Sequence, residues 1–235
     1  MKKLIAASTS TLYQGEFLEY LKPELRDHFD SIKTLLFIPY ARPGGISHQS
    51  YTDFVVKGMK SLPFSVRGIH EFGNPKRAIE GAEAIFVGGG NTFVLLDQLY
   101  QKELMDPLRS AVNSGVPYLG TSAGSNIVGQ SIKTTNDMPI VHPDSLQALG
   151  LIPFNVNPHY LDSDPKSIHQ GESRETRIRE FHTYNNTTVI GLREGSWIKV
   201  SGHKMTLKGT LTARIFKKNE SPFELAAESD LSELL

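Results

Sequence analysis

Short apolar runs separated by turn signals recur from the N-terminus to about residue 192. Each run holds four to six residues with little alternation, which is typical of parallel strands covered on both faces. Stretches of helical length lie between them, and this rhythm predicts an α/β fold with a mostly parallel sheet flanked by helices. The expected strands are 4–7, 34–39, 65–70, 84–87, 116–119 and 188–192. The expected helices are 51–60, 92–100, 107–113 and 172–182.

The pattern changes from about residue 195. Segments 196–200, 203–206 and 211–216 are short and alternating, with glycines between them, and they predict a small antiparallel C-terminal extension. The tail, 219–235, is polar and acidic, and we expect it to be loosely held. Because no repeat or low-complexity linker interrupts the chain, residues 1–235 are expected to form a single α/β domain.

Composition narrows the classes of function. Lys plus Arg and Asp plus Glu each number 25, and this balance argues against nucleic acid or an anionic membrane as a partner. The absence of cysteine excludes disulfides, cysteine nucleophiles and thiolate-bound metals. The apolar start at 4–7 is too short for a secretory signal or a membrane span, so we expect a cytoplasmic protein, either a monomer or a small homo-oligomer.

One glycine-rich motif has the pattern of a nucleophile elbow. Gly-Thr-Ser-Ala-Gly at 120–124 follows the apolar run 116–119 and precedes a helix-compatible segment. In this context the glycines allow a sharp turn from strand to helix, with the Ser122 hydroxyl projecting beyond the sheet and the Ala123 amide placed for an oxyanion. The alternative is an ordinary turn whose serine caps a helix.

A second glycine cluster, Gly88-Gly89-Gly90-Asn91, follows the run 84–87. Three glycines at the end of a strand let main-chain amides approach a ligand closely. The residues that complete a P-loop or a dinucleotide fingerprint are missing. An oxyanion-binding role beside Ser122 is therefore favoured over phosphate binding.

His159 is the candidate base among eight histidines. It lies in Asn-Pro-His-Tyr at 157–160, where the proline restricts the backbone that leads to the imidazole. Metal ligation by His159 with Asp162 and Asp164 matches no usual ligand spacing, so no metal is expected.

Two carboxylates compete to orient the histidine. Asp137 lies in a loop between the elbow and His159, and Glu194 follows the expected strand 188–192. The order Ser, Asp, His is that of α/β-hydrolases, but the three residues lie far closer in sequence than that fold allows. Either acid could instead be a solvated loop residue or a turn former.

Several motifs together resemble the peptidase E group of serine peptidases, family S51, which also holds cyanophycinase. The resemblance runs from Ile38-Pro39-Tyr40-Ala41 to Trp197 and implies a fold like that of class I glutamine amidotransferases. The motifs are Gly-Gly-Gly-Asn-Thr at 88–92, Ser-Ala-Gly at 122–124, Thr-Thr-Asn-Asp-Met-Pro-Ile at 134–140, Asn-Pro-His at 157–159, Gly171-Glu172, Arg174-Glu175, Arg-Ile-Arg-Glu at 177–180, Gly191-Leu192 and Glu194-Gly195.

The resemblance implies roles for these residues. Ser122 would be the nucleophile, His159 the base, and Asp137, narrowly preferred over Glu194, the third member of the triad. The amides of Gly90 and Ala123 would form the oxyanion hole, with Gly89 beside them. No cofactor is implied.

The resemblance also implies a substrate, since the family removes an N-terminal aspartate from dipeptides and some tripeptides. Arg174 matches the family's specificity arginine, and a guanidinium suits a carboxylate side chain. The alternative for Arg174 is a surface pair with Glu175 or Glu180. Thr121 stands where the family pattern has tryptophan, and the stretch 159–174 is about one residue longer than usual.

Three other functions remain open at this point. The same serine could serve a related hydrolase of other aspartyl peptides, similar to cyanophycinase, or an esterase with a different pocket. Outside enzymes, the glycine cluster and Ser122 could hold an anion in a binding module.

Overall fold

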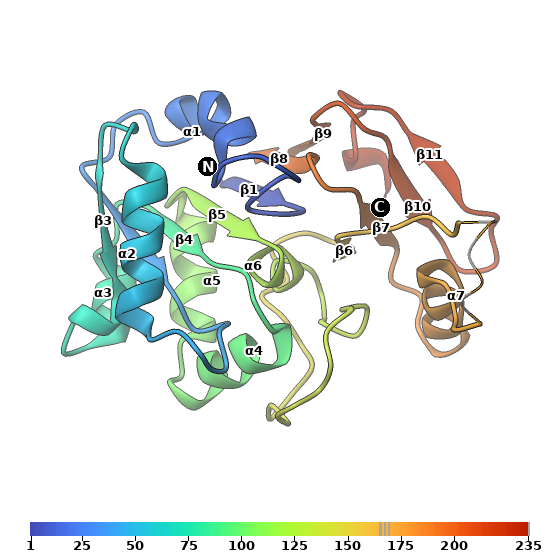
Figure 1. Cartoon of the computed structure of the whole chain (residues 1–235), viewed down its shortest axis with the longest axis horizontal. Coiled ribbons are helices and arrows are strands. Elements are labelled where there is room, and N and C mark those ends of the chain that lie inside the picture. The colour runs from blue at the N-terminus through green and yellow to red at the C-terminus, as the bar shows by residue number, and fades with distance from the viewer. Residues whose placement is uncertain (165, 167, 169, 235) are drawn as a thin grey trace.

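The computed structural model describes residues 1–164, 166, 168 and 170–234, arranged around two β-sheets (Figure 1). The larger sheet has seven strands in the order β3-β2-β4-β5-β1-β8-β9. The first five of these are parallel, and β8 and β9 continue the sheet antiparallel. Their bounds are β1 Lys3–Ala7, β2 Thr34–Ile38, β3 Ser65–Gly68, β4 Ile85–Val87, β5 Tyr118–Thr121, β8 Trp197–Ser201 and β9 Lys204–Lys208. The expected α/β class with a mostly parallel sheet is confirmed.

The second sheet has four strands in the order β11-β10-β7-β6. Here β6 and β7 run parallel, and β10 and β11 are antiparallel to their neighbours. The expected antiparallel extension is therefore divided, because β8 and β9 join the larger sheet while β10 joins the second. The strand expected at 188–192 also lies in the second sheet. The bounds are β6 Asn155–Pro158, β7 Val189–Leu192, β10 Ala213–Phe216 and β11 Phe223–Leu225.

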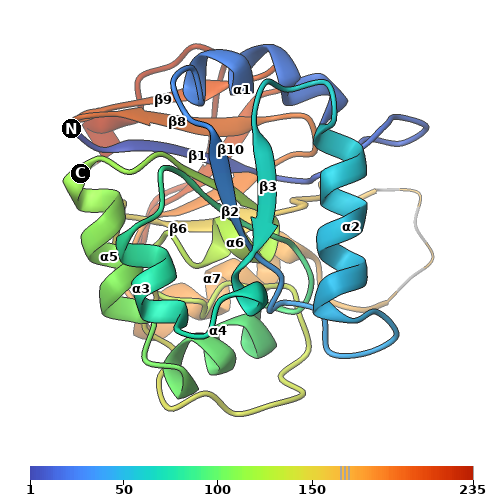
Figure 2. The same ribbon diagram turned by 90° about the vertical axis from the view of Figure 1, so that its left-hand side faces the viewer.

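Helices cover both faces of the larger sheet. In Figure 2, α2 lies on one side of β2 and β3, and α3, α4 and α5 lie on the other. Helix α1 joins α2 on its face, α6 follows β5, and α7 packs on the second sheet. The bounds are α1 Lys22–His28, α2 His48–Met59, α3 Pro75–Glu80, α4 Thr92–Gln101, α5 Met105–Ser114, α6 Ala123–Asn126 and α7 Arg174–Tyr184, with 3-10 turns at Glu19–Leu21, Ile69–Glu71 and Ser232–Leu234.

Burial on both faces explains the continuous apolar runs. In β1, Ile5 and Ala7 pack with the α1 and α2 side, whereas Leu4 and Ala6 pack with the α3 to α5 side. Successive side chains of a strand point to opposite faces, so a strand covered on both sides needs apolar residues at every position. The apolar cluster on the α3 to α5 side extends to Ile190 and other buried residues of the second sheet.

The C-terminal tail is held more firmly than its composition predicts. Strand β11 pairs with β10, and the Leu231 amide donates to the Met205 carbonyl at 2.7 Å. Leu231 is fully buried against the larger core. A few apolar residues in an otherwise polar segment therefore anchor the tail as far as Leu234. Within the described ranges, no helix has the length and apolar character that crossing a membrane requires.

Candidate active site

Ser122 lies in a tight, strained turn between β5 and α6. Its φ of 53° and ψ of −110° are sparsely populated by residues with a side chain. A Cβ on Gly120 would overlap the Gly124 carbonyl, and a Cβ on Gly124 would overlap the Val87 carbonyl of β4. Both glycines therefore permit the close chain approach that places Ser122 beyond the end of its strand.

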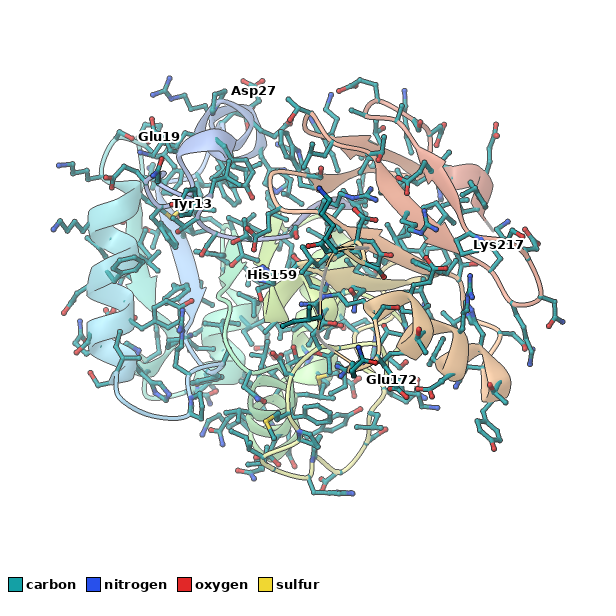
Figure 3. The ribbon with its side chains drawn as sticks, turned by 45° about the vertical axis from the view of Figure 1, so that its right-hand side comes forward. Tyr13, Glu19, Asp27, His159, Glu172 and Lys217 are labelled. Carbon is teal, nitrogen blue, oxygen red and sulfur yellow. The ribbon has the colours of Figure 1, made fainter. Side chains whose placement is uncertain are left out.

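His159 comes directly after β6 in the other sheet, and its ring reaches Ser122. The distance from His159 Nε2 to Ser122 Oγ is 2.9 Å. The His159 amide donates to Ser8 Oγ at 2.8 Å, and that hydroxyl donates in turn to the Leu192 carbonyl at 2.7 Å. Figure 3 shows His159 near the middle of the molecule, where the two sheets meet. The end of β1 therefore holds the backbone of His159.

Glu194, just after β7, contacts the opposite nitrogen of the same ring. Its Oε1 lies 2.6 Å from His159 Nδ1. A carboxylate only accepts hydrogen bonds, so Nδ1 carries the proton and Nε2 is left to accept from the Ser122 hydroxyl. This chain of two hydrogen bonds has the geometry of an activated serine.

Asp137, the acid that was preferred from the sequence, lines the same cavity but makes no hydrogen bond to the His159 ring among the described residues. Its Oδ2 accepts from the Thr92 amide at 2.7 Å, from Thr92 Oγ1 at 2.6 Å and from Thr135 Oγ1 at 3.2 Å. The adjacent Asn136 donates from Nδ2 to the Pro158 carbonyl at 2.9 Å. The loop thus supports the backbone before His159, while the imidazole itself is paired with Glu194.

Three main-chain amides in the turns that follow β4 and β5 have no protein acceptor among the described residues. Within the described part of the chain, no group accepts a hydrogen bond from the amides of Gly89, Gly90 or Ala123. A Cβ on Gly89 would lie 3.0 Å from Ser122 Cβ, which places the glycine turn directly beside the serine. Gly90 has a φ of 146°, a conformation that glycine tolerates. These donors suit a developing oxyanion.

A cavity of about 290 Å³ opens beside Ser122, and the guanidinium of Arg174 lines it. Its lining residues are Thr92, Ser122, Asn126, Thr135, Asn136, Asp137, Pro158, His159 and Arg174. Arg174 is half-buried, and no carboxylate of the described residues lies within 4.0 Å of it. Burial, and after it the neighbouring Arg177, lowers the pKa of Arg174 from its usual range, and yet the guanidinium stays charged at neutral pH.

The start of α7 fixes the position of Arg174. Ser173 caps the helix by accepting from the Thr176 amide at 3.1 Å. Glu175, which could have neutralised Arg174, instead pairs with Arg214 of β10 at 2.9 Å and with Arg179. The structure therefore brings Ser122, His159, Arg174 and both candidate acids to one place.

Sequence reasoning missed several residues of this site. Ser8 follows the first strand, and Thr92 follows Asn91, whose side chain caps α4 by accepting from the Val94 amide at 3.1 Å. The position of Ser8 at the carboxyl end of a parallel strand was a usable signal, since ligands and catalytic groups gather there. Asn126 lies four residues after the serine, and the local sequence gave no indication of a separate role for it.

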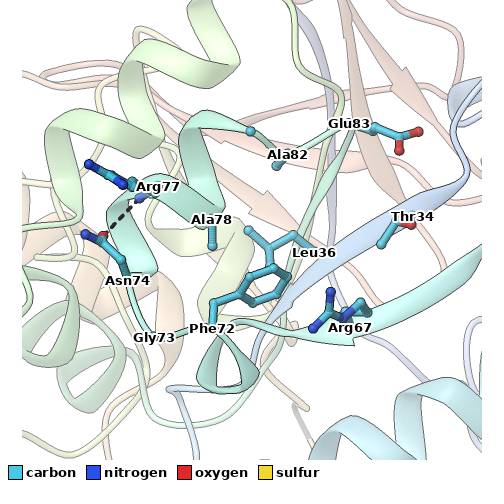
Figure 4. Close-up of a pocket in the computed structure, with 11 residues that line it drawn as sticks. Thr34, Leu36, Arg67, Phe72, Gly73, Asn74, Arg77, Ala78, Ala82 and Glu83 are labelled. Carbon is cyan, nitrogen blue, oxygen red and sulfur yellow. Dashed lines mark hydrogen bonds between the residues drawn. The ribbon is translucent and has the colours of Figure 1, made fainter.

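A further cavity, of about 410 Å³, lies between β2, β3 and α3 (Figure 4). Arg67, stacked over the Phe72 ring with 4.2 Å to its centroid, and Arg77 line it. Its described lining residues include no histidine, serine or cysteine, so the Ser122 cavity is the better candidate for chemistry. Over the described ranges, no group of three or more His, Asp or Glu residues is placed to hold a metal ion.

Sequence comparisons identify the family of this chain. The model of peptidase family S51 matches residues 4–208. Peptidase E of Streptomyces coelicolor is 47% identical over 232 residues, which cover 99% of this chain and 94% of the relative. A Drosophila melanogaster protein named "Probable alpha-aspartyl dipeptidase" is 45% identical over 237 residues, covering 100% of this chain and 98% of the relative.

A solved structure shows the same fold. The crystal structure of a peptidase from an acI-B1 actinobacterium superposes with a TM-score of 0.74 at 17% identity, covering 98% of this chain and 96% of that one. The match of the family model over most of the length, together with full-length relatives well above 40% identity, establishes the relationship. The chain belongs to peptidase family S51.

Proposed function

We propose that this protein is a serine dipeptidase that hydrolyses Asp-Xaa dipeptides. The observation that carries the proposal is Arg174, an unpaired cation in the same 290 Å³ cavity as the hydroxyl of Ser122, which is hydrogen-bonded to His159. A half-buried guanidinium that has no carboxylate partner among the described residues favours an anionic ligand. The name of the Drosophila relative, "Probable alpha-aspartyl dipeptidase", supports the same substrate.

The cavity offers a partner for each charge of an N-terminal aspartate. Arg174 would take the side-chain carboxylate. Asp137 would take the α-ammonium through Oδ1, because the three hydrogen bonds to this carboxylate all go to Oδ2. A carboxylate held by three donors is fixed in orientation, which suits binding better than proton transfer. This arrangement assigns Asp137 to substrate recognition.

The reaction would proceed through an acyl-enzyme. Ser122 Oγ attacks the aspartyl carbonyl carbon as His159 Nε2 takes the hydroxyl proton, and Glu194 stabilises the imidazolium through Nδ1–H. The amides of Gly90 and Ala123 donate to the oxyanion.

Collapse of the tetrahedral intermediate breaks the peptide bond, and His159 gives its proton to the leaving amine. Water, deprotonated by His159, then attacks the acyl-enzyme and releases aspartate and regenerates the Ser122 hydroxyl. Glu194, rather than Asp137, is thus proposed as the third member of the triad.

Hydrolysis of Asp-Leu, compared with Asn-Leu, Glu-Leu and Ala-Leu, tests the proposal. Ser122→Ala should abolish turnover, and Arg174→Met should remove the preference for Asp-Leu over Asn-Leu. Arg177→Met is the matched control, since Arg177 lies 4.0 Å from Glu172 and does not line the cavity.

Each of the other outcomes points to a different function. Serine-dependent cleavage of esters or β-aspartyl peptides, without cleavage of Asp-Leu, would indicate one of the other hydrolases. No turnover, together with failure of a fluorophosphonate to label Ser122, would indicate an anion-binding module.

A further inference from the structure

Asn126 is a buried amide without a hydrogen-bond partner in the wall of the Ser122 cavity. It follows Ser122 by four residues and ends α6. Its side chain is 2% exposed and lines the cavity together with Arg174 and Asp137. Oδ1 is sealed from solvent without a partner, and among the described residues Nδ2 donates to no acceptor either.

Asn126 differs from the neighbouring buried asparagines in that neither end of its side-chain amide has a partner among the described residues. Asn155 accepts from the Ser131 amide at 2.9 Å and donates to its hydroxyl at 3.1 Å. Asn157 also leaves Oδ1 unpaired, but its Nδ2 donates to the Thr134 carbonyl at 2.6 Å and to Asn136 Oδ1 at 3.0 Å. Nδ2 of Asn126, unlike Oδ1, is not among the sealed atoms, so it is the end of the amide that the cavity can reach, and an unpartnered donor in the wall of a binding cavity points to an acceptor supplied by the ligand.

We propose that Asn126 is a substrate-contacting residue whose Nδ2 donates to the side-chain carboxylate of the N-terminal aspartate, beside Arg174. The inference rests on the proposed dipeptidase function and extends it to the discrimination between aspartate and glutamate. A guanidinium on its own binds the side-chain carboxylate of either aspartate or glutamate. A second donor at a fixed distance from the nucleophile distinguishes their lengths.

The short helix α6 links Asn126 to the nucleophile. Ser122 immediately precedes α6 and Asn126 ends it, so their backbones are only four residues apart. The main-chain N–H of Asn126 donates to the Ser122 carbonyl at 2.9 Å, so the two residues move as one unit. If Asn126 Nδ2 is set for a carboxylate that is one methylene from Cα, the longer glutamate side chain must fold back to reach it. The carboxylate also has enough lone pairs to accept from both residues.

The α-ammonium is a weaker candidate for this contact. Asp137 lines the same cavity and has an oxygen that accepts no hydrogen bond from the described residues, which gives the ammonium a charged partner. An uncharged amide donor adds more binding energy to a carboxylate whose other partner is Arg174 alone than to an ammonium that is already paired with Asp137.

The test compares wild type, Asn126→Ala and Asn126→Asp on Asp-Leu, Glu-Leu and Ala-Leu. Each kcat/KM is divided by the fraction of molecules in which a fluorophosphonate labels Ser122, so that damage to the elbow is measured separately. Asn126→Ser replaces any variant that does not label. Asn74→Asp is the matched control, because Asn74 is exposed, caps α3 outside this cavity (Figure 4), and aspartate caps a helix equally well.

Loss of a hydrogen bond to a charged group predicts a fall of about 10- to 100-fold in kcat/KM for Asp-Leu in Asn126→Ala, with a narrowed ratio of Asp-Leu to Glu-Leu. Asn126→Asp should lose more, because its carboxylate repels that of the substrate. Ala-Leu, which lacks the carboxylate, should change little. Retention of Asp-Leu hydrolysis within twofold of wild type in both variants, or equal losses on Asp-Leu and Ala-Leu, would overturn the proposal.

A binding measurement separates this proposal from the proposed function. Free L-aspartate should protect Ser122 from labelling in wild type and protect it at least tenfold less well in Asn126→Asp. If wild type cleaves no Asp-Leu but shows this difference in protection, the dipeptidase function fails and the Asn126 contact stands. Equal protection in both proteins refutes the contact whatever the activity.

Discussion

The Tyr51 hydroxyl donates to the carbonyl of Gly89 at 3.1 Å, on the far side of the peptide group whose N–H belongs to Gly90. A trans peptide points its C=O and N–H in opposite directions, and no peptide in the described residues is cis. Tyr51 is 3% exposed, with Arg42 stacked over its ring at 5.1 Å. The tyrosine therefore orients and polarises one of the amides proposed for the oxyanion hole.

Tyr51→Phe should slow catalysis without weakening substrate binding. The hydroxyl does not line the cavity, and removing one neutral hydrogen bond is worth about 1 kcal/mol, so kcat for Asp-Leu should fall roughly 5-fold. KM should stay within twofold of wild type. Tyr100→Phe is the control, because Tyr100 donates to the Gln147 carbonyl at 2.9 Å, outside the site. Equal kcat values in the two variants would contradict the role.

Substitutions of Glu194 and Asp137 should change different kinetic constants. Glu194→Gln keeps the shape of the side chain but disturbs the tautomer of His159, so kcat should fall about 10²- to 10⁴-fold with little change in KM. Asp137→Asn should act chiefly on KM through loss of the ammonium partner. Steady-state rates on Asp-Leu check both variants. The reverse pattern would restore Asp137 as the orienting acid.

Gly124→Ala should damage the elbow. A Cβ at this position would overlap the Val87 carbonyl oxygen. Overpacking costs about 1–3 kcal/mol, so Tm should fall by about 3–10 °C and activity should be lost with it. Gly73→Ala serves as the comparison, because a Cβ there would meet nothing within 4 Å. Thermal unfolding that leaves the two variants alike would contradict this account of the turn.

His28 should make the fold sensitive to acid. Its ring is 1% exposed, with Nε2 lying 3.0 Å from the Tyr118 carbonyl, and burial lowers its pKa to about 3. The unfolded chain titrates near 6.5 and so binds this proton first as the pH falls. The stability that the neutral ring contributes is complete above about pH 6.5 and declines toward pH 3, by up to about 1.4 kcal/mol per pH unit.

Urea unfolding at pH 7 and pH 4.5 measures this decline. His28→Gln, which has no group that titrates in this range, should lose less free energy of unfolding between the two values than wild type does. The exposed His203, changed to Gln, should leave the difference as it is in wild type. Identical losses in wild type and His28→Gln would show that His28 does not set the acid sensitivity.

Local pattern predicted the larger sheet well because its strands are buried on both faces. The apolar run at 84–87 and the glycines that follow it were enough to predict a strand and its end, and β4 begins at Ile85 within that run. The second sheet was harder to foresee. Strand β7 has the same apolar character as β4, and only its pairing with β6 and β10, far away in sequence, assigns it to another sheet.

The acid beside His159 shows a different limit of local reasoning. Asp137 is near His159 in sequence and Glu194 is farther from it, but β6 and β7 are parallel neighbours. The residues just after adjacent parallel strands meet at one edge, which brings Glu194 to the ring. Spacing along the chain could not show this contact, because it depends on which strands pair.

The proposed triad draws its serine from one sheet and its histidine and acid from the other. Ser122 follows β5, whereas His159 and Glu194 follow β6 and β7. The 2.9 Å contact between Oγ and Nε2 therefore depends on how the two sheets are seated, and a misplacement of about 1 Å can cost about 100-fold in rate. The rate of hydrolysis therefore reports how the two sheets are positioned against each other. A low concentration of denaturant that loosens the contact between the sheets should abolish hydrolysis while circular dichroism still shows the secondary structure of both sheets.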